Sequence, residues 1–364
     1  MSILRCEVIV TRPRVAAALL AVLLCGALLA GCQADTAYAD GTYYAEFEEY
    51  DSYGYKEYMR VTVEDGAVTA LEYNAMDADG ALRTRVLNGL AIFLAAMLVL
   101  WVGLPLLAPA FVFLSLVALS EYAELMRLRG VPVRKRSLYV AAVLTLPASL
   151  PSTYPGMPTL AGGVSWREAL LVAFVIYVLV LEVVSANRSS INAAGFTIAG
   201  YLYVPFLLGY VVTLRYTPDG HLGLWFLAIP LLSAVASDVG AYMLGSLFGR
   251  TPLAPRVSPK KTIEGALGGL LLALVIVAAT AALARQAVGL ELGFGTVVVL
   301  TLITSLAAQL GDLFESLLKR WAGVKDAGVF LPGHGGVLDR IDSLLFTFPV
   351  SYLVVSVFVV PYVR

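Results

Sequence analysis

Residues 309–342 read QLGDLFESLLKRWAGVKDAGVFLPGHGGVLDRID, a charged stretch between two hydrophobic runs. It contains five acids (Asp312, Glu315, Asp326, Asp339, Asp342), four bases (Lys319, Arg320, Lys325, Arg340) and His334. Ionisable groups at a membrane are costly and usually face a partner, a water-filled cavity or a ligand. We therefore expect this stretch to lie at a membrane surface and to carry chemistry. The alternative is a solvated loop with structural ion pairs.

The first half of the stretch has helical spacing. Its polar residues recur at i, i+3, i+7 and i+10, which predicts a polar stripe on one helix face. These positions are Gln309, Asp312, Ser316 and Lys319. The hydrophobic residues between them predict that the rest of the helix faces other helices or lipid.

The second half begins with PGHGG at residues 332–336, which cannot continue a helix. Its glycines leave backbone N–H groups free to approach oxyanions closely. Asp339 and Asp342 follow, one helical turn apart, with Arg340 between them. Carboxylates beside clustered bases suit a magnesium ion that bridges phosphates.

A second polar stretch, at residues 237–269, reads SDVGAYMLGSLFGRTPLAPRVSPKKTIEGALGG. Asp238 follows a hydrophobic run, and it is either a metal ligand or the partner of a base in the next loop. Ser258 or Thr262 caps the following helix, with Glu264 in its first turn. The lysines of SPKK either bind phosphate or only mark the cytoplasmic side of the membrane and contact lipid headgroups.

The two stretches together resemble a known family. The pattern S-x-L-K-R-x4-K-D-x-G-x3-P-G-H-G-G-x-x-D-R-x-D runs without a gap from Ser316 to Asp342. It is similar to the signature of the membrane phosphatidate cytidylyltransferases, also called CDP-diacylglycerol synthases, and residues 237–269 resemble their other motif. The resemblance covers roughly residues 82–364.

The resemblance implies an enzyme that transfers a cytidylyl group from CTP to phosphatidate, giving CDP-diacylglycerol and pyrophosphate. The catalytic residues that it implies are Lys319, Arg320, Lys325, His334 and Arg340. The substrate-binding residues are Ser258, Lys260, Lys261, Ser316, Gly335 and Gly336. The ligands of a divalent metal, Mg²⁺, are Asp238, Asp312, Asp339 and Asp342. A second cation and a homodimer are compatible with the sequence, and we expect membrane lipid but no nucleic acid as a partner.

Composition predicts an all-α polytopic membrane protein. Hydrophobic residues make up 59% of the 364 residues and charged residues only 14%. The net charge of −1 points to no particular partner, and three cysteines do not make a disulfide framework. We expect about nine transmembrane helices, near residues 86–104, 105–120, 138–155, 169–186, 195–214, 222–246, 265–285, 293–311 and 343–362.

Basic residues sort the connecting loops. They gather at residues 127–136, 188, 250–261 and 319–340, whereas the intervening loops are poorer in bases. The positive-inside tendency therefore places all four base-rich loops, and both motif stretches, in the cytoplasm. We expect a multi-pass protein of the bacterial inner membrane with a cytoplasmic active site.

The first 81 residues have a different character. Residues 1–32 resemble a bacterial lipoprotein signal, in which LLAGC ends at Cys32, the residue that would carry lipid; the alternative is an uncleaved signal anchor. Residues 33–81 are polar, acidic and rich in Tyr, and predict a small exported β-hairpin with strands at 59–63 and 67–73. They resemble the opening hairpin of flavin-binding lipoproteins but contain no flavin attachment motif.

The signal and the membrane domain conflict in topology. A lipoprotein signal exports residues 33–81, whereas Arg83 and Arg85 favour the cytoplasm. Either residues 86–120 cross the membrane once, or the front of the chain is a fusion. We expect residues 82–364 to form the enzymatic domain in both cases.

Three other functions compete with this interpretation. A transporter would gather its polar residues near the bilayer midplane, whereas here they gather at one face. Another lipid-nucleotide or alcohol-phosphatidyl transferase is closer in chemistry, but the pattern D-G-x2-A-R-x8-G-x3-D-x3-D is absent. A lipid-anchored sensor with a degenerate membrane domain would not need an intact motif.

Overall fold

The computed structural model describes residues 41–46, 55–64, 67–77, 82–83, 95–160, 163–185, 191–325, 327–328 and 336–359. The chain divides into two compact units, Met1–Leu98 and Val99–Arg364. Several predicted features lie outside the described residues, namely the signal at 1–32 with Cys32, and Asp326, His334 and Gly335.

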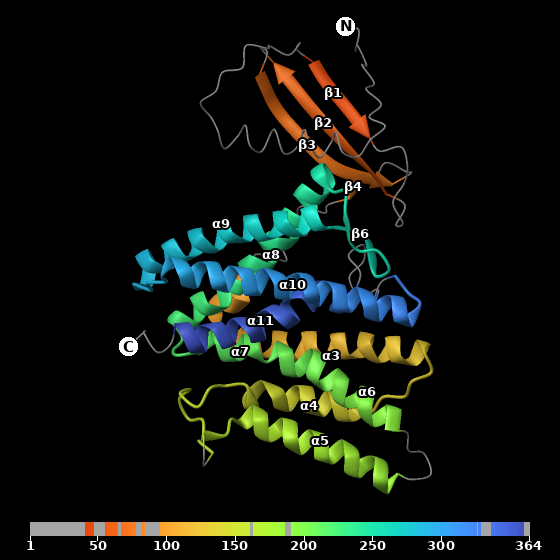
Figure 1. Cartoon of the computed structure of the whole chain (residues 1–364), viewed down its shortest axis with the longest axis vertical. Coiled ribbons are helices and arrows are strands. Elements are labelled where there is room, and N and C mark those ends of the chain that lie inside the picture. The colour runs from red at the N-terminus through yellow and green to blue at the C-terminus, as the bar shows by residue number, and fades with distance from the viewer. Residues whose placement is uncertain are drawn as a thin grey trace. The chain divides into compact units, whose positions relative to one another are not determined.

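The first unit contains an antiparallel sheet of β1 (Gly41–Glu46), β2 (Tyr55–Glu64), β3 (Ala67–Asp77) and β4 (Leu82–Arg83), in that order (Figure 1). The strands predicted at 59–63 and 67–73 lie within β2 and β3, which pair from Tyr55↔Asp77 to Glu64↔Ala67. The sheet is larger than the isolated hairpin that we expected. Sheets of three or more strands can be stable where a lone hairpin is marginal.

The second unit is helical, with α9 and α5 at opposite edges and the other long helices between them (Figure 1). Its helices are α3 (Leu104–Leu128), α4 (Lys135–Ala148), α5 (Trp166–Val184), α6 (Ile191–Tyr201), the π-helix η3 (Leu202–Phe206), α7 (Tyr210–Arg215), α8 (Leu222–Phe248), α9 (Ile263–Val288), α10 (Phe294–Ala322) and α11 (Leu338–Phe358). A short hairpin of β5 (Pro252–Ala254) and β6 (Ser258–Thr262) joins α8 to α9.

Six described segments are long and apolar enough to cross a membrane. They are Leu104–Leu128, Ile191–Arg215, Leu222–Phe248, Ile263–Val288, Phe294–Ala322 and Leu338–Phe358. The chain is therefore an all-α, multi-pass membrane protein, but the described residues do not supply the nine spans that we predicted. Helix α4 has only 14 residues, and α5 carries Arg167, Glu168 and Glu182 among its 19. At about 1.5 Å per residue, α4 is too short to cross a bilayer.

The break before α3 lies at a glycine. Residues 95–102 are helical, and Gly103 then adopts a φ of 81°, a conformation that glycine tolerates best. Pro105 lies in the first turn of α3, where its missing N–H costs nothing, and Pro109 lies inside the helix. Helix α3 continues to Leu128 instead of ending near residue 120 as predicted. The extension places Glu121 on a long helix.

Close packing of α8 against α9 positions the polar end of the domain. A Cβ added at Gly240 would lie 2.6 Å from the Gly268 carbonyl oxygen, so only a glycine allows this approach. Ile229 of α8, Val277 of α9 and Leu300 of α10 belong to one buried hydrophobic cluster. The β5–β6 hairpin follows α8 directly, and β6 contacts α8, α9 and α10. The packing thus brings both motif stretches together.

Candidate active site

A cavity of ≈450 Å³ with several charged side chains in its lining is formed by α8, α10, the β5–β6 hairpin and the start of α9. Its charged lining residues are Asp238, Lys260, Lys261 and Asp312. Ser258, Tyr242, Thr262 and Gln309 add polar groups. The two motif stretches, which lie far apart in the sequence, therefore share one cavity.

The hairpin side of this cavity is fixed by the cap of α9. Thr262, not Ser258, is the cap residue, since its hydroxyl accepts the N–H of Gly265 at 3.1 Å. Glu264 lies in the first turn, as predicted, and accepts the backbone N–H of Arg250 and of Thr251, each at 3.1 Å. These bonds tie the end of α8 to the start of α9 and hold β6 with its lysines over the cavity.

Three carboxylates from three different helices interact electrostatically, and two of them, Asp238 and Asp312, lie beside Lys261. Asp238 of α8, Asp312 of α10 and Asp342 of α11 are close enough to repel one another. Lys261 forms an ion pair with Asp312, and Asp238 is exposed. The backbones of α10 and α11 also touch here, because a Cβ added at Gly311 would lie 2.5 Å from the Asp342 carbonyl oxygen. Carboxylates that repel one another favour binding of a cation among them.

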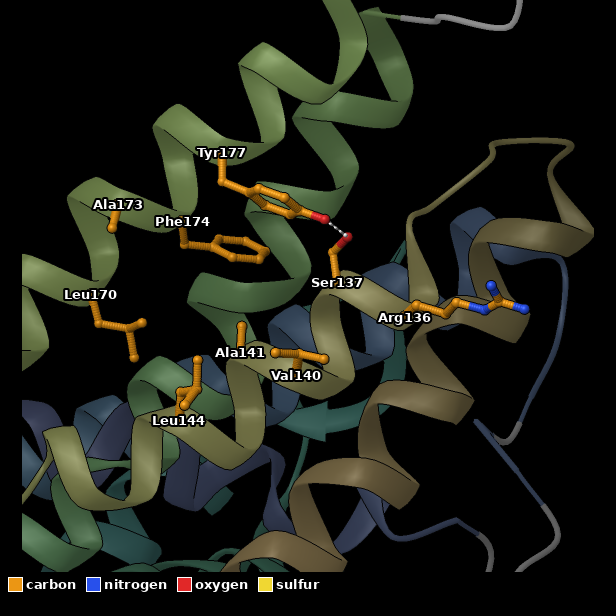
Figure 2. Close-up of a pocket in the computed structure, with 9 residues that line it drawn as sticks. All are labelled: Arg136, Ser137, Val140, Ala141, Leu144, Leu170, Ala173, Phe174 and Tyr177. Carbon is orange, nitrogen blue, oxygen red and sulfur yellow. Dashed lines mark hydrogen bonds between the residues drawn. The ribbon is translucent and has the colours of Figure 1, made fainter. Parts of the chain in front are cut away.

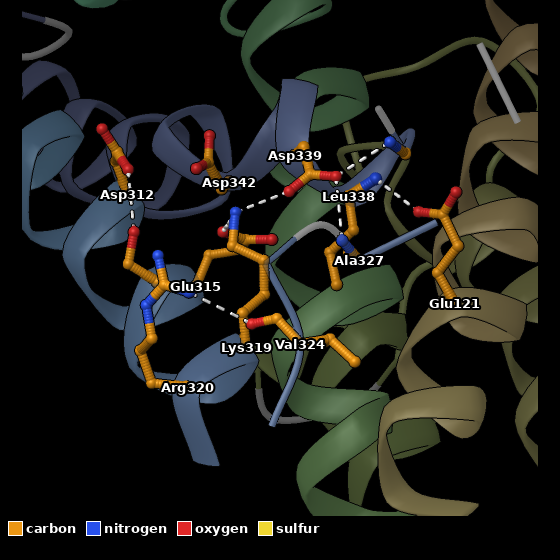
Figure 3. A network of polar contacts seen from close by, with 12 residues as sticks. Glu121, Asp312, Glu315, Lys319, Arg320, Val324, Ala327, Leu338, Asp339 and Asp342 are labelled. Atoms are coloured by element: carbon orange, nitrogen blue, oxygen red, sulfur yellow. Dashed lines mark hydrogen bonds and ion pairs between the residues drawn. The ribbon is translucent and has the colours of Figure 1, made fainter. Parts of the chain in front are cut away.

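A second charged group lies one turn further along α10 (Figure 3). Lys319 Nζ lies 2.5 Å from Glu315 Oε2 and 2.6 Å from Asp339 Oδ1. Glu315 is completely buried, and the Lys319 side chain is only 14% exposed. The ammonium group is therefore shared between two protein carboxylates, and it joins α10 to the first turn of α11.

Asp339 also holds the described ends of the PGHGG loop. Its Oδ2 accepts the backbone N–H of Ala327 at 3.1 Å and that of Gly336 at 2.8 Å (Figure 3). Gly336, one of the predicted substrate-binding residues, therefore donates its N–H to the protein.

The other predicted site residues lie around these groups. Arg320, Lys325, Arg340 and Lys260 have exposed side chains. Arg320 Nη1 donates to the Val324 carbonyl oxygen at 3.3 Å, beyond the end of α10. Ser316 Oγ lies 3.5 Å from Asp312 Oδ1. The structure thus brings Asp238, Lys261, Asp312 and Asp342 together and leaves Arg320, Lys325 and Arg340 at the surface, while the exposed Lys260 lies at the edge of the cavity that it lines.

Three residues that the sequence analysis left out of the site also belong to this region. Glu121 of α3 is buried and accepts the N–H groups at the start of α11. Tyr203 of η3 has a buried hydroxyl with no hydrogen-bond partner among the described residues. This hydroxyl interacts electrostatically with Asp312, Glu315, Asp339 and Asp342. Gln309 donates to the Ala266 carbonyl oxygen at 3.1 Å. The one available signal for Glu121 was an acid inside an apolar run.

The acids of the cavity fit a magnesium ion only together with a substrate. Among the described residues, no three His, Cys, Asp or Glu side chains form a group that could hold a metal by themselves. Magnesium is usually held by one or two carboxylates together with substrate phosphates, so two of Asp238, Asp312 and Asp342 would suffice as protein ligands. Asp339 fits less well, because Lys319 and two backbone N–H groups already occupy its oxygens.

Another cavity, of ≈350 Å³, lies between α4 and α5 (Figure 2). Its lining is mostly apolar, with Ser137 Oγ 3.4 Å from the Tyr177 hydroxyl. The side chain of Arg136 points away from the cavity (Figure 2). None of the described residues that line this cavity is a carboxylate. The charged cavity at α8 and α10 is therefore the candidate active site.

Comparison with known proteins agrees with this arrangement. The profile of the cytidylyltransferase family matches residues 83–358, which include both motif stretches and the whole cavity. The chain belongs to the cytidylyltransferase family. The match begins after the strands β1 to β3 and ends at the last residue of α11. The family resemblance inferred from the motifs is thereby confirmed.

Three bacterial members of the family are similar over most of their length. A phosphatidate cytidylyltransferase of Bacillus subtilis (strain 168) is 32% identical over 277 residues, which is 76% of this chain and 98% of the relative. Those of Staphylococcus epidermidis and Staphylococcus aureus (strain COL) are 33% and 34% identical over 264 residues, each covering 70% of this chain and 95% of the relative. These relatives are enzymes, which argues against the transporter and sensor alternatives.

Proposed function

We propose that this cytidylyltransferase transfers the cytidylyl group of CTP to phosphatidate, giving CDP-diacylglycerol and pyrophosphate. The observation that carries the proposal is the cavity that joins Asp238, Lys261 and Asp312 at the end of membrane-spanning helices. The named relatives catalyse reactions on phosphatidate, and the chain covers nearly all of their length. The protein is thus a membrane-bound transferase of phospholipid biosynthesis.

The reaction needs alignment and charge neutralisation more than covalent catalysis. A phosphate oxygen of phosphatidate attacks the α-phosphorus of CTP. The bond from that phosphorus to the bridging oxygen breaks, and pyrophosphate leaves with the electron pair. A phosphomonoester has a second pKa of about 6, so the attacking oxygen is ionised at neutral pH and needs no strong general base.

The bases of the two motifs would neutralise the phosphates. Lys260 and Lys261 line the cavity directly. We further propose phosphate contacts for Arg320, Lys325, Arg340 and His334, and hydrogen bonds to substrate from Ser258, Ser316 and Gly335. The N–H of Gly336 already donates to Asp339, so Gly336 supplies no hydrogen bond to substrate. Lys319 has a different role, because Glu315 and Asp339 already neutralise its charge. It orients the start of α11 and raises the local positive potential less than an unpaired lysine would.

A magnesium ion would be held by Asp238, Asp312 and Asp342. When bound, the ion would neutralise phosphate oxygens and favour attack on the α-phosphorus. Lys261 already pairs with Asp312. When nucleotide and metal enter together, Lys261 could exchange Asp312 for a phosphate, and Asp312 could exchange Lys261 for the metal. A second cation near the same carboxylates would satisfy the charge of a triphosphate.

For the whole protein we propose an orientation with the cavity in the cytoplasm, in a bacterial inner membrane. The base-rich loops, one of which supplies Lys260 and Lys261 to the cavity, support this orientation. We also propose that α5 and the segment before α3 are further crossings, since each is mostly apolar, whereas α4 is too short to be one. A homodimer is a further proposal, to be tested by measuring the mass of the purified protein in detergent.

The proposed activity is tested with the full-length protein in detergent micelles that contain phosphatidate. We expect CDP-diacylglycerol and pyrophosphate in equal amounts when CTP and Mg²⁺ are present, and neither product when CTP is omitted. The phosphatidate cytidylyltransferase of Bacillus subtilis, purified in parallel, is the positive control. A folded preparation that makes no product while the control is active would show that the proposed function is wrong.

A further inference from the structure

Glu121 of α3 contacts the start of α11, more than 200 residues further along the chain. Its Oε1 accepts the N–H of Val337 at 2.9 Å. Its Oε2 accepts the N–H of Leu338 at 2.7 Å (Figure 3). The side chain is only 6% exposed. Both carboxylate oxygens are thus used to hold the end of the PGHGG loop and the first turn of a helix.

The physical reason for this contact is the free N–H groups at a helix N-terminus. The first four N–H groups of a helix have no partner within the helix, and the helix dipole favours a negative charge there. A buried carboxylate in turn needs hydrogen bonds to offset its lost hydration. The described contacts give Glu121 no basic partner, so the two N–H groups and the helix dipole compensate its charge.

The contact also extends to the other end of the loop. A Cβ added at Gly328 would lie 2.5 Å from Glu121 Oε1, and one added at Gly336 would lie 2.7 Å from Oε2. Both glycines therefore pack directly against the same carboxylate. Asp339 makes the complementary pair of bonds, to the N–H groups of Ala327 and Gly336. Glu121 and Asp339 together form a carboxylate clamp on the two ends of the loop.

We propose that Glu121 is a positioning residue for cytidylyl transfer. It fixes the ends of the motif loop and the first turn of α11, and thereby sets where Asp342 lies relative to Asp238 and Asp312. It touches no reacting atom. The proposal rests on the proposed cytidylyl transfer for its catalytic consequence, but the clamp itself can be measured without substrate.

The test compares two variants that disturb the same contact from opposite sides. Glu121→Gln removes the charge and replaces one acceptor oxygen with a donor, and Gly328→Ala adds a methyl group against the carboxylate. Glu124→Gln, an exposed acid on the same helix that pairs with Arg127, is the matched control. Gly195→Ala, whose added Cβ meets nothing within 4 Å, is the control for the glycine.

Two readouts separate positioning from general destabilisation. Hydrogen exchange without substrate should become faster at the amides of Val337 and Leu338 in Glu121→Gln, and elsewhere it should remain as in the unaltered protein. The kcat should fall about 10- to 100-fold, with the KM for CTP changed less than about 3-fold, since misplaced groups lose transition-state contacts. Both controls should behave like the unaltered protein.

Each outcome bears on the proposal. Faster exchange at Val337 and Leu338 with normal kcat in both variants would overturn the catalytic role of the clamp. If Glu121→Gln does not fold, Gly328→Ala decides, and unchanged kcat in that variant also overturns the proposal. An unaltered protein without activity would refute the proposed function, and the exchange data alone would then show whether the clamp exists. The double variant Glu121→Gln/Gly328→Ala would confirm a shared contact if its kcat were no lower than that of the more severe single variant.

Discussion

Lys319 Nζ lies 2.6 Å from Asp339 Oδ1, and this ion pair joins α10 to the first turn of α11. The same ammonium lies 2.5 Å from Glu315, which is completely buried. A lysine that the motif suggests for phosphate binding is therefore already engaged by two protein acids. Its contribution to the site is mainly structural, and this distinguishes it from Lys261 in the cavity.

The first prediction follows from this burial. Lys319→Ala should destabilise the protein by about 3–5 kcal/mol, because it leaves Glu315 and Asp339 buried without a counter-charge. We expect a clearly lower midpoint of thermal unfolding in detergent and loss of activity. Combining Lys319→Met with Glu315→Gln should restore part of the stability, since the uncompensated charge is then smaller. A Lys319→Ala protein as stable as the unaltered one would contradict the structural role.

Lys261 gives the opposite prediction. It lines the cavity and is 28% exposed, so Lys261→Ala should unfold at nearly the same temperature as the unaltered protein. Loss of a charged hydrogen bond costs about 1.5–3 kcal/mol, so kcat/KM for CTP should fall roughly 10- to 150-fold. Arg285→Ala, which removes an exposed ion pair with Glu291, is a suitable control. If the kinetics of Lys261→Ala were normal, Lys261 would only help to set the orientation of the chain in the membrane.

The metal can be tested on the three gathered carboxylates. Asp312→Asn and Asp342→Asn should abolish turnover while the protein remains folded, because their charges repel one another and do not support the fold. Asp238→Asn should raise the Mg²⁺ concentration needed for half-maximal activity. EDTA should inactivate the unaltered enzyme, and added Mg²⁺ should restore it. Activity that persists in EDTA would show that no divalent ion is required.

Asp339→Asn provides a contrast on the same helix. Its oxygens hold Lys319 and the N–H groups of Ala327 and Gly336, so we expect a loss of thermal stability together with a loss of activity. Asp339 would return to the set of metal ligands if the variant lost activity and changed its Mg²⁺ dependence while its thermal stability stayed the same.

The sequence predicts the class of fold because hydrophobic runs and base-rich loops are local signals. It places helices near most of the expected spans, yet it does not show that α4 has only 14 residues or that α3 continues to Leu128. These boundaries depend on packing. The break at Gly103 is an example, since the nearby Pro105 and Pro109 are both accommodated in α3.

The candidate site is predicted in its residue types but not in its pairings. The predicted polar stripe on α10 brings Ser316 Oγ to 3.5 Å from Asp312 Oδ1, while Lys319, on the same stripe, pairs with Glu315. Whether Lys319 faces a ligand or an acid depends on α11, which the stripe cannot reveal. Glu121 could not be found in this way, because its partners Val337 and Leu338 are more than 200 residues away.

The final prediction concerns residues 1–81, which lie outside the part of the chain that matches the family. Every residue with a proposed chemical or positioning role lies at or beyond Glu121. A chain that starts at Leu82 should therefore insert in the membrane and make CDP-diacylglycerol at a rate within about 3-fold of the full chain, as expected for changes remote from an active site. Loss of activity in a correctly inserted chain would mean that the front segment contributes to catalysis.

The front segment also bears on the membrane topology of the full chain. If the signal at residues 1–32 is used, position 50 lies outside the cell, whereas the bases at 127–136 favour the cytoplasm. We expect cysteine labelling in intact cells to reach a cysteine at position 50 and not one at position 136, provided that residues 86–120 cross the membrane an odd number of times. Labelling on the same side at both positions would mean that the signal does not export the segment after it. In that case the β1–β4 sheet stays on the side of the active site, and Cys32 carries no lipid.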